Sequence, residues 1–195
     1  MTSLYALAAQ ARRLNREVGG PPVPTLFFLT DPGRTPDPVA IAKRLPPETA
    51  VIYRHFGAAD RAQVAGQLAA VARTRHLVLL IAADPDLADR TGAAGVHWPE
   101  RLLHRAGASG LNTASAHSRE GVLNAQGIGV DAILLGPVFR TRSGAGNPPL
   151  GLFRASQIAR AVAAPVIALG GVTAASAQRL SGRGFAGVAA IDAFL

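Results

Sequence analysis

A segment rich in glycine and arginine, GPVFRTRSGAGNPPLG (136–151), combines residue types that suit the binding of an anion. Arg140 and Arg142 can donate charge-assisted hydrogen bonds to a phosphate, and glycines let a backbone approach a ligand closely. The segment lies between two apolar stretches that have the patterns of a buried strand and a buried helix. It is therefore either a ligand-binding loop or a simple connection between two elements.

Three other side chains could transfer protons. His97 lies within the short apolar stretch GVHW (95–98), where it is either a catalytic acid–base group or an interior histidine with satisfied hydrogen bonds. Glu100 follows Pro99 and is either a catalytic acid–base group or a residue in the first turn of a helix. His117 precedes a helix start at Ser118 and is expected at the rim of a pocket.

The elements that must position these residues are short apolar runs separated by alanine-rich helical stretches. Continuous apolar strands indicate a parallel sheet that is buried on both faces. Eight strand–helix units predict an α/β fold, a (β/α)8 TIM barrel, with an open doubly wound sheet as the alternative. The expected strands are 25–30, 50–55, 77–82, 95–98, 110–115, 132–136, 166–170 and 187–191, and the helices include 37–45, 59–75 and 152–163.

Both ends of the chain add to this expectation. The N-terminal stretch has an apolar face formed by Leu4, Leu7, Ala8, Ala11 and Leu14, which predicts an extra amphipathic helix before the first strand. After the last expected strand little sequence remains, so the last helix is expected to be short or missing. Residues 1–195 are predicted to form a single barrel domain.

The amino-acid composition indicates which kinds of binding partner to expect. The net charge is +8, but the basic residues are nineteen arginines and one lysine that are scattered along the chain, and aromatic residues are few. This pattern argues against a nucleic-acid surface, whereas the positive charge suits a small phosphorylated ligand. No apolar run is long enough for a membrane span, and there is no signal-peptide pattern and no cysteine. A cytoplasmic location without membrane or nucleic-acid partners is expected.

Five segments, in this order and spacing, resemble the thiamine phosphate synthase superfamily, which includes the TenI-like thiazole tautomerases. The segments are AAGVHWPE, NTASAHSREG, DAILLGPVFRTRS, APVIALGGV and GFAGVAAIDAF, and the resemblance is weak before about residue 77. It implies a (β/α)8 barrel that often associates into homo-oligomers. The synthase joins a pyrimidine pyrophosphate to a thiazole phosphate and expels pyrophosphate with Mg²⁺, whereas the tautomerase isomerises a thiazole carboxylate phosphate by acid–base chemistry.

The resemblance assigns roles to individual residues. Gly170 and Gly171 match a glycine pair whose backbone N–H groups bind phosphate, although a tight strand–helix turn is the alternative. Ala190 and Ile191 match a second phosphate-binding segment. The expected substrate-binding residues are Arg54, Ser115, Arg140, Thr141 and Arg142, and the Arg142→Ala substitution is expected to weaken the binding of a phosphate ester.

The same resemblance fails at the positions that would hold magnesium and pyrophosphate. Ala82 and Ala83 occupy the places of an Asn-Asp pair, Leu102 replaces an aspartate, and a lysine is missing beside Arg140 and Arg142. Apolar side chains do not coordinate Mg²⁺, so no metal site is predicted and Mg²⁺ is expected only if the synthase reaction is retained.

The tautomerase pattern departs as well. Pro137 occupies the place of its histidine, for which His97 and His117 are the possible replacements. The sequence predicts a protein that acts on or binds a phosphorylated thiazole or a related thiamine precursor. The alternatives are a non-catalytic binder of thiamine phosphates or another small phosphate ester, and a barrel enzyme of changed chemistry.

Overall fold

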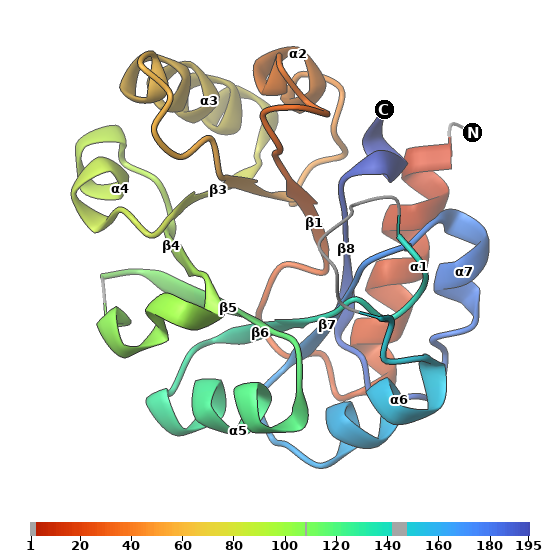
Figure 1. The fold of residues 1–195 in the computed structure, drawn as a ribbon. Helices are drawn as coiled ribbons and strands as arrows, with labels where there is room; N and C mark the ends of the chain where they lie inside the picture. Colours follow the sequence, from red (N-terminus) through yellow and green to blue (C-terminus); the bar gives the residue numbers. More distant parts are fainter. Residues whose placement is uncertain (1–2, 108, 142–147) are drawn as a thin grey trace.

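Eight parallel strands close into a barrel in the computed structural model, which describes residues 3–107, 109–141 and 148–195 (Figure 1). Each strand pairs with the next along the chain, and β8 closes the barrel against β1 with Ala190 opposite Phe28. The strands are β1 (Leu26–Leu29), β2 (Ala50–Tyr53), β3 (Val78–Ala82), β4 (Gly95–Trp98), β5 (Leu111–Ala116), β6 (Ala132–Leu135), β7 (Val166–Leu169) and β8 (Gly187–Ala190). The predicted barrel is therefore confirmed, and the open sheet is excluded by the β1–β8 pairing.

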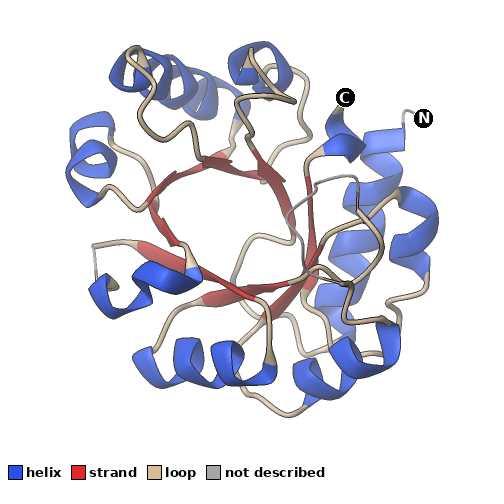
Figure 2. Ribbon diagram, viewed as in Figure 1, coloured by secondary structure: helices blue, strands red, loops and turns tan. Residues whose placement is uncertain are grey.

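Helices surround this barrel (Figure 2). They are α1 (Ser3–Glu17), α2 (Pro38–Ala42), α3 (Arg61–Arg75), α4 (Pro85–Thr91), α5 (Arg119–Ile128), α6 (Leu152–Arg160) and α7 (Ala174–Gln178), with the 3-10 helices η1 (Glu100–Arg105) and η2 (Asp192–Phe194). The extra N-terminal helix is present as α1, which lies beside α7 (Figure 1). After β8 the structure has only the short 3-10 helix η2, in agreement with the expectation that the last helix of the barrel is short or missing. None of the helices in the described ranges is long and apolar enough to cross a membrane.

The core has two layers because successive side chains of a strand point to opposite faces of the sheet. In β1, Phe27 and Leu29 pack inside the barrel, whereas Phe28 belongs to the layer between the strands and the helices. All three side chains are buried. Burying each large apolar side chain contributes about 1.5–3 kcal/mol, and because both faces are covered the strands are continuously apolar.

Side-chain caps fix where several helices begin after their strands. Asp84, Ser118 and Thr173 each accept a hydrogen bond from a backbone N–H in the first turn of α4, α5 and α7, respectively. Such a cap typically contributes about 1 kcal/mol and leaves little freedom in the length of the preceding loop. The loops that follow β3, β5 and β7 are therefore held in place where they leave the barrel.

Candidate functional site

A cavity of about 530 Å³ opens at the end of the barrel where the strands finish. Residues that follow β1, β2, β5, β6, β7 and β8 line it. In a parallel (β/α)8 barrel this is the face on which ligands bind, because the loops that leave the strands can vary there without disturbing the barrel. Its volume suits a small ligand.

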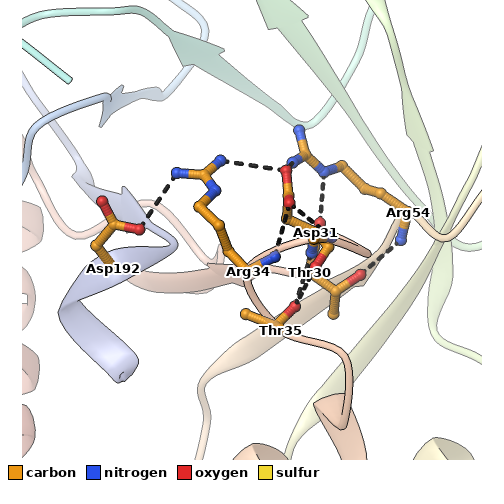
Figure 3. A network of polar contacts seen from close by, with 7 residues as sticks. Thr30, Asp31, Arg34, Thr35, Arg54 and Asp192 are labelled. Carbon is orange, nitrogen blue, oxygen red and sulfur yellow. Dashed lines mark hydrogen bonds and ion pairs between the residues drawn. The ribbon is translucent and has the colours of Figure 1, made fainter. Parts of the chain in front are cut away.

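Four charged residues form a network on one side of the cavity, and we call Asp31, Arg34, Arg54 and Asp192 the arginine network (Figure 3). Arg34 lies between the two carboxylates: its Nη1 is 3.2 Å from Oδ1 of Asp192 and its Nη2 is 3.2 Å from Oδ2 of Asp31. Arg54 Nη2 lies 3.6 Å from the same Asp31 oxygen. The network joins the loops after β1 and β2 to η2 after β8, and so connects both sides of the barrel closure.

Local hydrogen bonds hold Asp31 in this position. Its carboxylate accepts the N–H groups of Gly33 and Arg34, both at 3.1 Å. The Thr35 hydroxyl accepts the N–H of Asp31 at 2.7 Å and donates to the carbonyl of Asp31 at 2.9 Å. Asp31 thus shapes a tight turn, as expected of aspartate before proline, and also carries the charge that holds two arginines.

Neighbouring arginines keep Asp31 ionised. Burial raises the pKa of Asp31, but hydrogen bonds from Arg34 and the charges of Arg34 and Arg54 outweigh it, so that the pKa lies below its ordinary value. Burial lowers the pKa of Arg54, and the neighbouring Asp31 opposes this effect. An arginine remains protonated near neutral pH in any case.

Arg54 combines anchoring with an unused donor. Its Nε donates to the carbonyl of Thr30 at 2.8 Å, and its backbone N–H donates to the Thr30 hydroxyl at 2.9 Å. Within the described part of the chain, Nη1 of Arg54 and the whole guanidinium of Arg140 have no partner. Both residues line the cavity, so they can offer charged N–H donors to an anion there.

Two glycines bring the loop after β7 against the loop after β6. Gly170 and Gly171 have φ angles of +91° and +66°, which side chains disfavour. A Cβ atom on Gly170 would overlap Pro137, and one on Gly171 would overlap the carbonyl of Arg140. This packing gives both glycines a structural role whether or not a ligand binds, and it places their backbone at the cavity wall.

Backbone amides provide a second group of donors. In the described ranges we find no acceptor for the N–H groups of Gly170, Gly171 and Ile191, and all three residues line the cavity. Unpaired N–H groups of this kind are the donors that bind phosphate in many barrels. The cavity therefore has both neutral and charged donors along the segments that follow β2, β6, β7 and β8.

The two histidines near β4 and β5 have different surroundings. His97 is buried, with Nδ1 2.9 Å from the Thr113 hydroxyl and Nε2 2.9 Å from the Ser115 hydroxyl. Burial lowers the pKa of His97 to about 3. His117 is exposed, and its Nδ1 lies 2.5 Å from the Glu100 carboxylate. Only His117 lines the cavity.

The predicted site residues separate into two groups. Those that line the cavity are Arg54, His117, Arg140, Thr141, Gly170, Gly171, Ala190 and Ile191. His97, Glu100 and Ser115 do not line it: His97 and Ser115 bond each other at the end of the barrel interior, and Glu100 stands behind His117. Arg142 lies outside the described residues, so its role stays a prediction.

Sequence reasoning predicted only Arg54 of the arginine network and missed Asp31, Arg34 and Asp192. The available signal was their position, since Arg34 is three residues after Asp31 in the loop that follows β1, and Asp192 comes two residues after β8 ends. Position alone does not reveal that one guanidinium joins two carboxylates 158 and 3 residues away along the chain. That link depends on closure of the barrel.

The positions that the resemblance assigns to magnesium ligands have other functions in this fold. Asp84 is the carboxylate one residue beyond the Ala82–Ala83 positions; it accepts the N–H of Leu87 at 3.0 Å and lies 3.6 Å from Arg61 Nε, so it caps α4 and is ion-paired. Ala82 belongs to the barrel interior, and Leu102 packs against the outer core layer. No group of three or more His, Cys, Asp or Glu side chains that could hold a metal ion exists in the part of the chain that is described.

A closed (β/α)8 barrel with a donor-rich cavity at the ends of its strands defines a class of small-ligand barrels. Within that class the chain belongs to the thiamine monophosphate synthase family, whose model matches residues 26–194. The match covers all eight strands and the segments that line the cavity.

Individual proteins support this assignment. The chain is 33% identical over 138 residues to a putative thiamine-phosphate synthase 2 of Aquifex aeolicus, covering 68% of this chain and 74% of that one. It is 30% identical to a thiamine-phosphate synthase of Synechococcus, covering 87% of this chain and 52% of that longer protein. A solved thiamine phosphate pyrophosphorylase from Pyrococcus furiosus has a TM-score of 0.72 at 26% identity, covering 86% of this chain and 85% of that chain.

Proposed function

We propose that the chain binds a small phosphate ester of thiamine metabolism, a phosphorylated thiazole or a closely related precursor, in the 530 Å³ cavity. The observation that carries the proposal is the set of unpaired donors along the cavity wall. Arg54 and Arg140 supply charged N–H groups, and Gly170, Gly171 and Ile191 supply backbone N–H groups. A phosphate dianion offers enough acceptor oxygens to use several of these donors at once.

We further infer that magnesium-dependent pyrophosphate chemistry is lost in this chain. Mg²⁺ requires oxygen ligands in near-octahedral geometry. At the positions concerned Ala82 and Leu102 have no side-chain oxygen, and the carboxylate of the nearby Asp84 is already used by the start of α4 and by Arg61. The residues present do not fit the ion, so no step of the proposed function passes through it.

Binding without turnover and catalysis of another reaction both remain compatible with such a site. The cavity donors serve either role, because each requires the phosphate to be held. The contact between Glu100 and His117 favours an enzyme, since a carboxylate that orients a histidine at a cavity is an arrangement suited to proton transfer.

A thermal-shift panel tests the proposal. Thiazole phosphate, thiamine phosphate and hydroxymethylpyrimidine pyrophosphate are each added with and without Mg²⁺, because a ligand that binds the folded state raises the melting temperature. We expect stabilisation by thiazole phosphate or thiamine phosphate that does not depend on Mg²⁺.

The controls separate the two parts of the proposal. Arg54→Met should reduce the shift, whereas Arg12→Met, an identical change at an exposed residue of α1 that does not line the cavity, should not. Stabilisation by the pyrophosphate only when Mg²⁺ is present would contradict the loss of the metal site. No stabilisation by any of the three compounds would contradict the ligand class.

A further inference from the structure

The end of β2 has an outer face that carries no part of the cavity. Side chains of a strand alternate between the two faces of the sheet, so Arg54 lines the cavity while Tyr53 belongs to the outer core layer. His55 lies on the same outer side, because its ring centroid is 5.0 Å from that of Tyr53. Both side chains are buried, and neither lines the cavity. The backbone that carries Arg54 is therefore packed from two sides.

Arg61, the first residue of α3, covers this outer face. Its guanidinium carbon lies 5.3 Å from the ring centroid of Tyr53 and 5.3 Å from that of Phe56. Both distances are in the range of cation–π contacts. One arginine therefore contacts the residue before Arg54 and the second residue after it. We call Tyr53, His55, Phe56 and Arg61 the outer cluster.

The guanidinium of Arg61 is also fixed by β3 and the loop that follows it. Nη2 donates to the carbonyl of Ala82 at 2.9 Å, and Nε lies 3.6 Å from Oδ2 of Asp84. Asp84 is itself held in place, because it caps α4. A planar guanidinium can stack on rings while its edge binds oxygen atoms, which the point charge of a lysine cannot do. Arg61 thus connects the end of β2 to the end of β3 from outside the barrel.

Unpaired polar atoms gather in the outer cluster. Four buried side-chain polar atoms have no hydrogen-bond partner in the described ranges, and three of them are Oη of Tyr53, Nε2 of His55 and Nη1 of Arg61. A buried polar atom without a partner lowers the stability of a protein. Apolar side chains at these positions would avoid that cost, and such violations are typical of residues that serve a function. The cluster is therefore not explained by stability alone.

We propose that Arg61 is a positioning residue for Arg54, and that through the outer cluster it fixes the direction in which Arg54 enters the cavity. Thr30 holds Arg54 from the inner side, by hydrogen bonds with its backbone N–H and its Nε. Arg61 supports the same stretch of backbone from the outer side, and it does not line the cavity itself. Nη1 of Arg54, which has no partner in the described chain, reaches a ligand only while both supports are present.

The effect of Arg61 on binding follows from the geometry of hydrogen bonds. A hydrogen bond weakens steeply when its donor turns away from the acceptor, so a small displacement of the Arg54 guanidinium lowers the affinity for an anion. A binding residue therefore depends on the side chains that hold it. Because the role of Arg54 follows from the proposed binding of a phosphate ester, the role of Arg61 rests on that proposed function.

A double-mutant cycle with thiazole phosphate as the probe separates positioning from a general loss of stability. Dissociation constants are measured by calorimetry for the wild type, Arg61→Met, Arg54→Met and the double variant. We expect Arg61→Met to raise the dissociation constant about 5-fold in the wild-type background and less than about 2-fold in the Arg54→Met background. Arg73→Met, at an exposed residue of the same helix, is the matched control and should leave the dissociation constant unchanged.

Phe56→Ala is a second variant that keeps the test valid if Arg61→Met does not fold. Phe56 is 49% exposed, so its loss leaves the core intact but removes one ring from the guanidinium of Arg61. We expect the dissociation constant to rise about 2- to 3-fold, again only when Arg54 is present. Equal effects in the wild-type and Arg54→Met backgrounds, for either variant, would show a merely structural role and overturn the inference.

Hydrogen exchange of the Arg54 Nε–H provides a readout that needs no ligand. This group donates to the carbonyl of Thr30, and its ¹⁵N–¹H signal is identified by its absence in Arg54→Met. We expect its exchange with water to be about 10-fold faster in Arg61→Met than in the wild type, and unchanged in Arg73→Met. Unchanged exchange in Arg61→Met would overturn the inference. If the wild type binds no thiazole phosphate, the proposed function fails, and this measurement still decides whether Arg61 positions Arg54.

Discussion

The two sides of the cavity rim use charge in different ways. In the arginine network each guanidinium is tied to a carboxylate, and Arg34 is tied to two. In the Glu100–His117 pair one ring nitrogen is held while the other is left without a partner in the described residues. The first arrangement holds the loops after β1 and β2 against η2, and the second leaves one ring nitrogen of His117 open at the cavity.

A second contrast is found near β4 and β5, between a histidine in the barrel interior and a histidine at the rim of the cavity. His97 and His117 are the same residue type, and each contacts oxygen atoms. Burial favours the neutral form of His97, whereas His117 is exposed and lines the cavity. Residue type alone therefore does not reveal a role, and substitutions at these positions should separate the two environments.

The largest effect is expected for His97→Leu. The substitution leaves the buried Thr113 hydroxyl without its partner, and each buried polar group left unpaired costs about 1–3 kcal/mol. We expect the free energy of unfolding at pH 7.5 to fall by about 2–4 kcal/mol in urea titrations. His117→Asn, at the rim, should change it by less than about 0.5 kcal/mol. Equal losses in the two variants would remove the distinction between interior and rim.

The arginine side should dominate ligand affinity. Arg54→Met removes a charged donor at the cavity, and a hydrogen bond to a charged group contributes about 1.5–3 kcal/mol. We expect the dissociation constant for thiazole phosphate to rise about 10- to 100-fold by calorimetry. Arg12→Met is the control for net charge. An unchanged dissociation constant in Arg54→Met would assign the phosphate to the backbone donors alone.

Acid should destabilise the protein through His97. Its pKa is about 3 when folded, against about 6.5 when unfolded, so between these values the unfolded chain binds a proton that the folded protein does not. The free energy of unfolding therefore keeps its full value above about pH 6.5 and falls as the pH decreases. The expected fall between pH 7.5 and 5.5 is about 1.4 kcal/mol. His97→Leu should lose this contribution, which a comparison of urea titrations at the two pH values measures. A slope unchanged by the substitution would show that His97 is protonated in the folded state.

The smallest effect is expected at Asp31. Its pKa lies below the ordinary value, so its ion pairs stabilise the fold above about pH 4 and the contribution is lost as the pH falls through the lowered pKa. Because the pairs are partly exposed, Asp31→Asn should cost only about 0.5–1 kcal/mol at pH 7. The difference between wild type and variant should shrink toward pH 2 in urea titrations. A constant difference at every pH would assign the effect to the turn hydrogen bonds and not to charge.

Much of the fold could be predicted because buried parallel strands leave a clear pattern. Each expected strand is present, with ends that differ by at most two residues: β4 matches 95–98 at both ends, and β1 covers Leu26–Leu29 against 25–30. Helix ends were less accurate: α2 covers Pro38–Ala42 against 37–45, and α6 covers Leu152–Arg160 against 152–163. Helix ends depend on turns and tertiary packing, which local patterns describe poorly.

The site could be predicted only where its residues follow directly from strand ends. Arg54 and the glycine pair come immediately after strands, and closure of the barrel brings such positions to one face. The contact of Glu100 with His117 spans 17 residues, and that of Arg34 with Asp192 spans 158. Contacts of this range depend on how the loops pack and leave no local signal.

The sequence by itself determined the barrel and the positions at which polar residues gather, because strand periodicity and strand–helix alternation are local properties. Only the tertiary structure decided which polar residues have their hydrogen bonds satisfied and which remain open to a ligand. His97 and His117 show this most directly. Both ring nitrogens of His97 have hydroxyl partners, Thr113 and Ser115, whereas Glu100 contacts only Nδ1 of His117. The physical reason is that partner choice and desolvation are set by neighbours in space, which distant parts of the chain supply.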